Sequence, residues 1–214
     1  MPAALPSAAG RGRRAARATG DDREQAILTT AERLLEDRSL AAISVDDLAR
    51  GAGISRPTFY FYFASKDAVL LALLDRVVAE ADAALVAAFD SPAAGPRAAW
   101  ERALRAYHDT FRTHRSLTVA WAEARASSPA VRALWAEVFQ RWVQRCAAAI
   151  EAERRRGAAP AGPAARDLAI ALTSMNERVI YASLSGDGPA VADPDVVPVL
   201  LRVWLTAVYG DEPG

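Results

Sequence analysis

Apolar side chains recur every three or four positions along most of this chain, and a strand-like alternation persists nowhere. Within residues 22–36 acidic residues occupy the first turn, and one face carries Ile27, Ala31, Leu34 and Leu35. That spacing, with negative charge at the amino end, predicts an amphipathic helix. Because the same period continues to the end of the sequence, we expect an all-α fold.

Residues 44–66 predict two short helices joined by a glycine turn. Ser44 precedes the first apolar-periodic run, and Asp47 follows three residues later, which is the arrangement of a capping box. Gly53 can adopt the left-handed conformation that ends such a helix.

The second of these helices is expected from Ser55 to about Tyr62. Ser55 can cap it, and Pro57 is tolerated because N–H groups of the first turn have no intrahelical partner. Two helices joined by a short turn are typical of a helix-turn-helix, whose second helix enters the major groove of DNA.

The next predicted helix is long. Ser65 can cap it, and from Lys66 the pattern runs without glycine or proline to about Phe89. Two prolines and a glycine in residues 91–96 then interrupt it. Five more helices bring the expected total to about nine, and they cover 97–113, 116–125, 129–156, 165–185 and 195–209.

Composition divides the chain into three parts. Residues 1–20 carry four arginines and no acid, and they lack periodicity, so they are expected to form a disordered basic arm. Such an arm is either a solvated tail or a segment that reaches DNA phosphates or the minor groove. Residues 21–66 would form the DNA-binding head, and residues 67–214 a larger second domain.

Charge and cysteine content narrow the class of protein. The net charge of the 214 residues is zero, so no overall basic field attracts nucleic acid. The single cysteine, Cys146, excludes an intramolecular disulfide and fits a reducing cytosol. No window approaches 18 consecutive apolar residues, and the first twenty lack the apolar core of a signal peptide. We therefore expect a cytoplasmic protein with no membrane partner.

An enzyme with a helical active site is a weaker alternative. His108 and His114 are the only histidines, and no metal-ligand or catalytic-triad spacing accompanies them. Both histidines are expected on helix or turn surfaces, and no cofactor is predicted.

The run ISVDDLARGAGISRPTFYFYFASKDAVLLALLDRV resembles the N-terminal signature of the TetR family of transcriptional repressors. Further along, ALWAEVFQRW, IEAERRRGAAP and ALTSMNERVIYAS resemble the EthR-type branch of that family. The resemblance implies a homodimer, a near-palindromic operator in double-stranded DNA, and a cavity for a small hydrophobic ligand that releases the repressor.

On this resemblance, the second short helix reads the bases. The base-reading residues would be Arg56, Pro57, Thr58 and Tyr60, and the phosphate contacts would be Ser44, Ser55, Tyr62 and Lys66. Arginine can bond bidentately to guanine, and a proline ring or threonine methyl can pack on a thymine methyl.

The aromatic run of this helix divides into two groups. Phe59 and Phe63 are four residues apart on one face, so packing is their expected role. The hydroxyls of Tyr60 and Tyr62 favour DNA, whereas the pattern assigns no role to Phe61.

The aromatic side chains after residue 96 would be core by spacing alone. The resemblance instead makes them the lining of the ligand cavity: Trp100, Tyr107, Phe111, Trp135, Phe139, Trp142 and Trp204. Asn176 matches the polar anchor of the ligand in these relatives, with Thr173 one turn earlier. A buried amide needs a partner, which either another helix or a ligand must supply. Arg145 and Trp121 depart from the relatives' pattern.

The last two helices are apolar on more than one face, which requires burial on both sides. The second partner would be the same helix pair of another subunit, related by a two-fold axis. Sequence leaves open two other regulators: one of the same fold without a small-molecule inducer, and an activator.

Overall fold

The computed structural model describes residues 20–90, 95–186 and 188–210. Within these ranges the chain forms nine α-helices and one short 3₁₀ helix, with no strand. The all-α prediction is therefore confirmed, and so is the helix-turn-helix at the amino end. The predicted arm at 1–20 lies outside the described residues except for Gly20, which begins the first helix.

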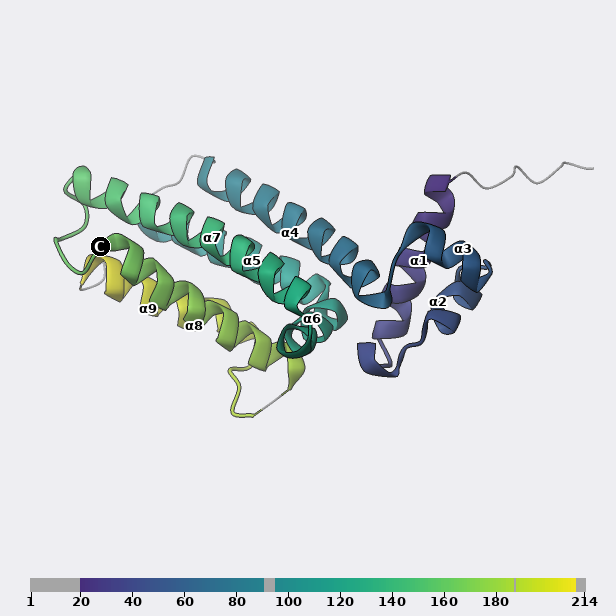
Figure 1. The fold of residues 1–214 in the computed structure, drawn as a ribbon. Coiled ribbons are helices and arrows are strands. Elements are labelled where there is room, and N and C mark those ends of the chain that lie inside the picture. The colour runs from purple at the N-terminus through teal and green to yellow at the C-terminus, as the bar shows by residue number, and fades with distance from the viewer. Residues whose placement is uncertain (1–19, 91–94, 187, 211–214) are drawn as a thin grey trace, which may run out of the picture.

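Three helices form a small head at one end of an elongated molecule, and the remainder forms a helical body at the other end (Figure 1). The head consists of α1 (Gly20–Leu35), the 3₁₀ turn η1 (Leu40–Ala42), α2 (Val45–Gly51) and α3 (Arg56–Tyr62). The body consists of α5 (Pro96–Thr113), α6 (Arg115–Ser127), α7 (Pro129–Arg155), α8 (Ala165–Ser185) and α9 (Asp193–Tyr209). Helix α4 (Lys66–Asp90) belongs to both parts, because it begins at the head and extends along the body.

The helix caps and the glycine turn predicted for the head are present in the structure. The Ser44 hydroxyl accepts from the Asp47 N–H at 3.1 Å, and the Asp47 carboxylate accepts from the Ser44 N–H at 3.0 Å. Gly53 has φ 68°, the left-handed value that ends α2, and the Ser55 hydroxyl accepts from the Thr58 N–H. Each pair satisfies backbone groups that a helix end leaves free, which fixes where α2 and α3 begin.

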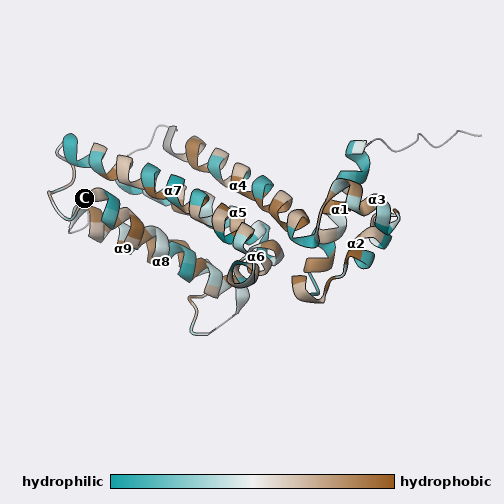
Figure 2. Ribbon diagram, in the orientation of Figure 1, coloured by the Kyte–Doolittle hydropathy of each residue, from teal (hydrophilic) through white to brown (hydrophobic). Residues whose placement is uncertain are grey.

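Close packing holds the three head helices together. Ile27, Leu28, Leu48 and Phe59 are each at most 1% exposed. A Cβ on Gly51 would lie 2.3 Å from the Thr30 Cγ2, so α2 can approach α1 this closely only with glycine at that position. Hydrophobic and hydrophilic residues are interspersed along the helices, as expected of amphipathic helices that surround a shared core (Figure 2).

Lys66 fastens the start of α4 to the head. Its ammonium donates to the carbonyls of Leu40, Ala41 and Ile43 at 2.7, 3.2 and 3.0 Å. The turn η1 was not predicted, and the three carbonyls belong to two of its residues, Leu40 and Ala41, and to Ile43, which directly follows it. All three donors of the ammonium are used, so Lys66 serves the fold rather than standing free for a phosphate.

The two histidines lie in different environments, and one of them differs from the prediction. His108 is 5% exposed, and its Nε2 lies 3.1 Å from an Asp193 carboxylate oxygen at the start of α9. His114 is half-buried, with Nε2 3.0 Å from a carboxylate oxygen of Glu80. The expectation of a surface position was therefore wrong for His108, whose carboxylate partner on α9 the sequence did not reveal, whereas His114 lies at the turn between α5 and α6 with 27% of its side chain exposed.

Several helix ends also differ by a few residues from the prediction. Helix α6 is longer at its carboxyl end, and α9 begins two residues earlier because Pro194 is accepted in its first turn. In the described part of the chain, no helix is long and apolar enough to cross a membrane.

Replacing Lys66 with methionine should destabilise the protein. The substitution keeps the aliphatic stem and leaves the carbonyls of Leu40, Ala41 and Ile43 without their charged donor, so we expect a loss of about 2 kcal/mol in the free energy of unfolding. Urea denaturation measures this loss. Arg50→Met is the matched control, since its side chain is 79% exposed and should change stability by less than about 0.5 kcal/mol. Equal stability of the two variants would contradict the anchoring role of Lys66.

Candidate functional site

Six of the eight residues predicted to meet DNA lie on α3 or cap its start, whereas Ser44 caps α2 and Lys66 begins α4. Ser55, Arg56, Pro57 and Tyr60 are exposed, while Thr58 is half-buried. The short α2 and its cap Ser44 lie beside them in the head (Figure 1). This face presents hydroxyl, guanidinium and phenol groups to solvent, which are the groups that contact base edges and phosphates.

Arg56 is already paired in the free protein. Its Nη1 lies 3.3 Å from a carboxylate oxygen of Asp46 on α2, and its Nη2 lies 3.4 Å from the Tyr60 hydroxyl. The hydrogen bond to Tyr60 and the charge of Asp46 raise the pKa of Arg56 above its usual value. The base-reading role of Arg56 stays a prediction, and in that role DNA would compete with Asp46 for the guanidinium. Sequence reasoning missed Asp46, although its place in the first turn of α2 was visible.

Other members of the predicted contact set have partners of their own. The Ser44 hydroxyl also donates to Asp47 at 2.7 Å, and hydrogen bonds from Ser44 lower the pKa of Asp47 to about 2. Lys66 is bound to η1. Tyr62 is half-buried and packs edge-on against Phe61 at 5.2 Å between ring centroids. For Ser44, Tyr62 and Lys66 a phosphate contact stays a prediction, and for Lys66 it requires giving up a bond within the head.

The aromatic run splits as the pattern suggested. Phe59 and Phe63 are 0% and 7% exposed, so their predicted packing role is consistent with the structure. Phe61 is 82% exposed, the most of the exposed large apolar side chains in the described chain. It stands on the same short helix as Arg56 and Tyr60.

In the body, an inner compartment of about 400 Å³, part of it open to solvent, lies between α4, α5, α7, α8 and α9. It is lined by Leu85, Trp100, Ala103, Leu104, Tyr107, Trp142, Cys146, Thr173, Asn176 and Trp204. Six of these ten residues belong to the predicted ligand set. The walls are mostly apolar and aromatic, with polar groups from Tyr107, Cys146, Thr173, Asn176 and the tryptophan indoles, which is the composition of a small-molecule pocket.

The polar groups of the inner compartment are not equally satisfied. Asn176 Oδ1 accepts from the Trp204 indole N–H at 2.9 Å, so a neighbouring helix supplies the partner that this amide was predicted to need. The Thr173 hydroxyl is buried, and no nitrogen or oxygen of the described protein satisfies it. Burial raises the pKa of the Cys146 thiol to about 11, so it stays protonated. The Thr173 hydroxyl lies against that thiol, where its hydrogen bond partly offsets the rise in the pKa.

Trp142 ties this compartment to α4. Its indole N–H donates to Asp82 on α4 at 2.9 Å, and Arg145 Nη1 lies 3.6 Å from the same carboxylate oxygen. Leu85, one turn further along α4, lines the compartment. Arg145, which departs from the pattern of the relatives, thus pairs with a residue of α4, the helix that carries the head.

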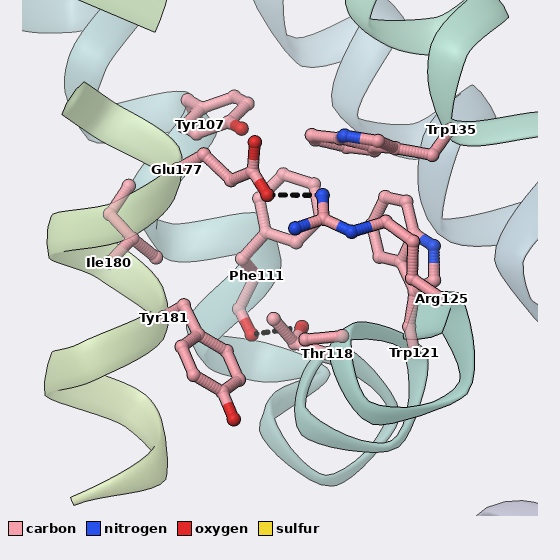
Figure 3. Close-up of a pocket in the computed structure, with 10 residues that line it drawn as sticks. Tyr107, Phe111, Thr118, Trp121, Arg125, Trp135, Glu177, Ile180 and Tyr181 are labelled. Atoms are coloured by element: carbon pink, nitrogen blue, oxygen red, sulfur yellow. Dashed lines mark hydrogen bonds and ion pairs between the residues drawn. The ribbon is translucent and has the colours of Figure 1, made fainter. Parts of the chain in front are cut away.

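An outer compartment of about 390 Å³, also partly open, shares Tyr107 with the inner one, and Figure 3 shows its lining. It is lined by Tyr107, Phe111, Thr118, Trp121, Ala122, Arg125, Trp135, Glu177, Ile180 and Tyr181. Tyr107 lines both compartments and divides them. Burial raises its pKa, so the phenol stays neutral. Trp121, the second departure, stands in this wall, 4.6 Å from Trp135 between ring centroids.

One predicted lining residue lies elsewhere. Phe139 borders neither compartment and packs on Trp135 at 5.7 Å. Helical spacing predicted that it would share one face of α7 with Trp135 and Trp142, but its position around the helix axis keeps it out of both compartments. Sequence also missed Arg125 and Glu177, because neither belongs to the aromatic stripe.

Comparison with known proteins finds one family model that matches the head with the start of α4, and another that matches the body. A family model for "Bacterial regulatory proteins, tetR family" matches residues 27–73, and one for "Transcriptional regulator EthR, C-terminal domain" matches residues 100–210. The chain is 54% identical over 202 residues to the HTH-type transcriptional regulator EthR of Mycobacterium tuberculosis, covering 94% of each chain. It is 50% identical to EthR of Mycolicibacterium smegmatis, over 95% of this chain and 94% of the relative.

The fold is also found in solved structures. A transcriptional regulator from Saccharomonospora viridis in complex with choline matches with a TM-score of 0.72 and 24% identity, over 85% of this chain and 95% of that one. At that identity the likeness concerns the fold alone. The relatives and both family models are transcriptional regulators, not enzymes. The chain therefore belongs to the TetR family of transcriptional regulators and, within that family, to the EthR type.

Proposed function

We propose that this regulator is a homodimeric repressor that binds a near-palindromic operator and is released by a small, largely apolar ligand. The observation that carries the proposal is the hydrogen bond between Trp142 in the cavity wall and Asp82 on α4. The same helix begins at Lys66, which holds the head. From Lys66 to Asp82 is about 24 Å along the helix axis.

The release mechanism follows from this geometry. Two reading helices of a dimer fit successive major grooves only at a spacing of about 34 Å. A ligand wedged beside Trp142 moves the point at which α4 meets the body, and α4 carries that movement to α3. The ligand must bind more tightly to the conformation in which the two reading helices no longer match the spacing of successive major grooves. Equal affinity for both conformations would shift no equilibrium.

Two surface valines support dimerisation through the last helices. Most apolar residues of α8 and α9 are buried within the chain, but Val199 and Val203 of α9 are 42% and 39% exposed. They stand one turn apart on one side of the helix. A second copy of α8 and α9 would cover them, as a two-fold interface requires.

Two alternatives remain in the same fold. A regulator without an inducer is favoured by the bond between Asn176 and Trp204, since the cavity's own side chains already satisfy the amide. An activator would use the same reading face. The experiments below separate the first alternative from the proposal.

Arg56→Ala should relax sequence preference. The variant loses the guanidinium that reads guanine, so its affinity for duplexes selected from a random library should fall about 5- to 150-fold, with little change on unrelated DNA. Fluorescence anisotropy measures both affinities. Arg105→Ala is the control, because that arginine lies on α5 and pairs with Glu101 in the body. An equal loss on every sequence would contradict the base-reading role.

Val203→Asp should yield monomers. A charge at the centre of the proposed interface faces its own copy across the two-fold axis, so light scattering should give the 22.9 kDa mass of one chain. Val86→Asp is the matched control, since Val86 is 44% exposed on α4 and should leave the mass doubled. A monomeric unmodified protein at micromolar concentration would overturn the proposed dimer.

Trp142→Phe should separate ligand binding from DNA release. The ring stays, but the bond to Asp82 is lost, so apolar ligands should still quench tryptophan fluorescence while releasing less DNA than they release from the unmodified protein. Trp135→Phe, in the outer wall, should keep normal release. If no member of a library of apolar compounds changes DNA binding of the unmodified protein, the alternative without an inducer is correct.

A further inference from the structure

The outer compartment already contains a cation. Arg125 of α6 extends across it, with its guanidinium paired to Glu177 of α8 and its Cζ 5.3 Å from the centroid of the Trp135 ring (Figure 3). The side chains of Arg125 and Glu177 are 34% and 27% exposed. The pair therefore lies at the mouth of the compartment, between solvent and the aromatic wall.

The walls around this guanidinium suit a flat positive charge. Phe111 and Trp121 stack at 6.1 Å between ring centroids, and Trp121 meets Trp135 edge-on at 4.6 Å. Aromatic faces carry negative electrostatic potential and attract cations, most strongly where water is excluded. A carboxylate from Glu177 completes the enclosure. The face of Trp135 therefore attracts a cation, and octanoate tests below whether the Arg125 guanidinium and the Trp121 indole N–H, which is buried without a hydrogen-bond partner among the described residues, attract an anion instead.

We propose that the outer compartment binds the head of an amphipathic organic cation, a guanidinium or amidinium attached to an apolar chain, and that Arg125 is its built-in competitor. This deepens the proposed function, because it names the chemistry of the ligand for the same cavity. The ligand head displaces Arg125 from Glu177 and Trp135. The apolar chain passes Tyr107 into the inner compartment, where Trp100 and Trp142 cover it.

Displacement of Arg125 is physically feasible. The residue is partly exposed, so its charge can turn outward into water when a ligand takes its place. A further pocket beside Glu177 is lined by both Arg125 and Arg178, so Arg178 is the other basic residue there. The charged group of the ligand thus takes the place of the Arg125 guanidinium beside Glu177, so one cation replaces another at the mouth of the compartment.

A matched pair of probes tests the proposal on the full-length protein. Octylguanidinium and octylurea share the chain and the planar head but differ in charge, and octanoate supplies the anion. Titration followed by tryptophan fluorescence should show octylguanidinium binding about tenfold more tightly than octylurea, with octanoate weakest.

Two variants assign that preference to the ion pair. Glu177→Gln should reduce the advantage of octylguanidinium over octylurea to about threefold or less, while binding of octylurea stays unchanged. Arg125→Met, which removes the competitor, should tighten octylguanidinium about fivefold or more and change octylurea little. Arg178→Met is the control and should change neither. Because Arg125→Met leaves Glu177 without its partner, its folding is checked by thermal unfolding, and Glu177→Gln tests the same contact if Arg125→Met does not fold.

The outcomes separate this inference from the proposed function. Equal binding of octylguanidinium and octylurea would overturn the inference, since the ion pair would then only join α6 to α8 while the cavity still binds apolar chains. Tightest binding of octanoate would overturn it in favour of an anion site at Arg125. If none of the three probes binds, both the inference and the ligand-binding function fail.

Discussion

Helix α4 is the constraint on which the rest of the structure depends, because it is fixed at two distant points. At one end the Lys66 ammonium is held by three carbonyls of the head. Further along, Asp82 accepts from Trp142 in the wall of the inner compartment. A continuous helix between two anchors moves as a rigid body, so neither the head nor the cavity wall can shift without affecting the other.

The two recognition surfaces of the molecule share a physical principle. In each of the two proposed surfaces an ion pair of the protein would have to open: Arg56 would leave Asp46 for DNA, and Glu177 would exchange Arg125 for the ligand cation. An external partner must offer more than the internal one before the arginine moves. Because opening the pair costs the same free energy for every partner that requires it, such competition weakens all of these partners by the same factor.

Sequence predicted those features that depend on neighbouring residues. The capping box of Ser44, the left-handed Gly53 and the periodicity of the long helices follow from spacing alone, and the family signature placed α3 as the reading helix. The missed features join residues far apart in sequence. Lys66 bonds to a turn more than twenty residues earlier, and Arg125 pairs with Glu177 across 52 residues. No periodicity encodes such partners, because tertiary packing selects them.

The side chain that joins head and body is also chemically unique. Lys66 is the one lysine among the 214 residues, since arginine supplies every other basic side chain. An amine-specific acylating reagent therefore finds a single side chain to modify, and that amine is engaged by backbone carbonyls while the head stays docked on α4. The rate of acylation becomes a direct measure of how often this joint opens, readable by mass without introducing any label. Because the sequence has a single lysine, its acylation reports specifically on the contact between the head and the start of α4.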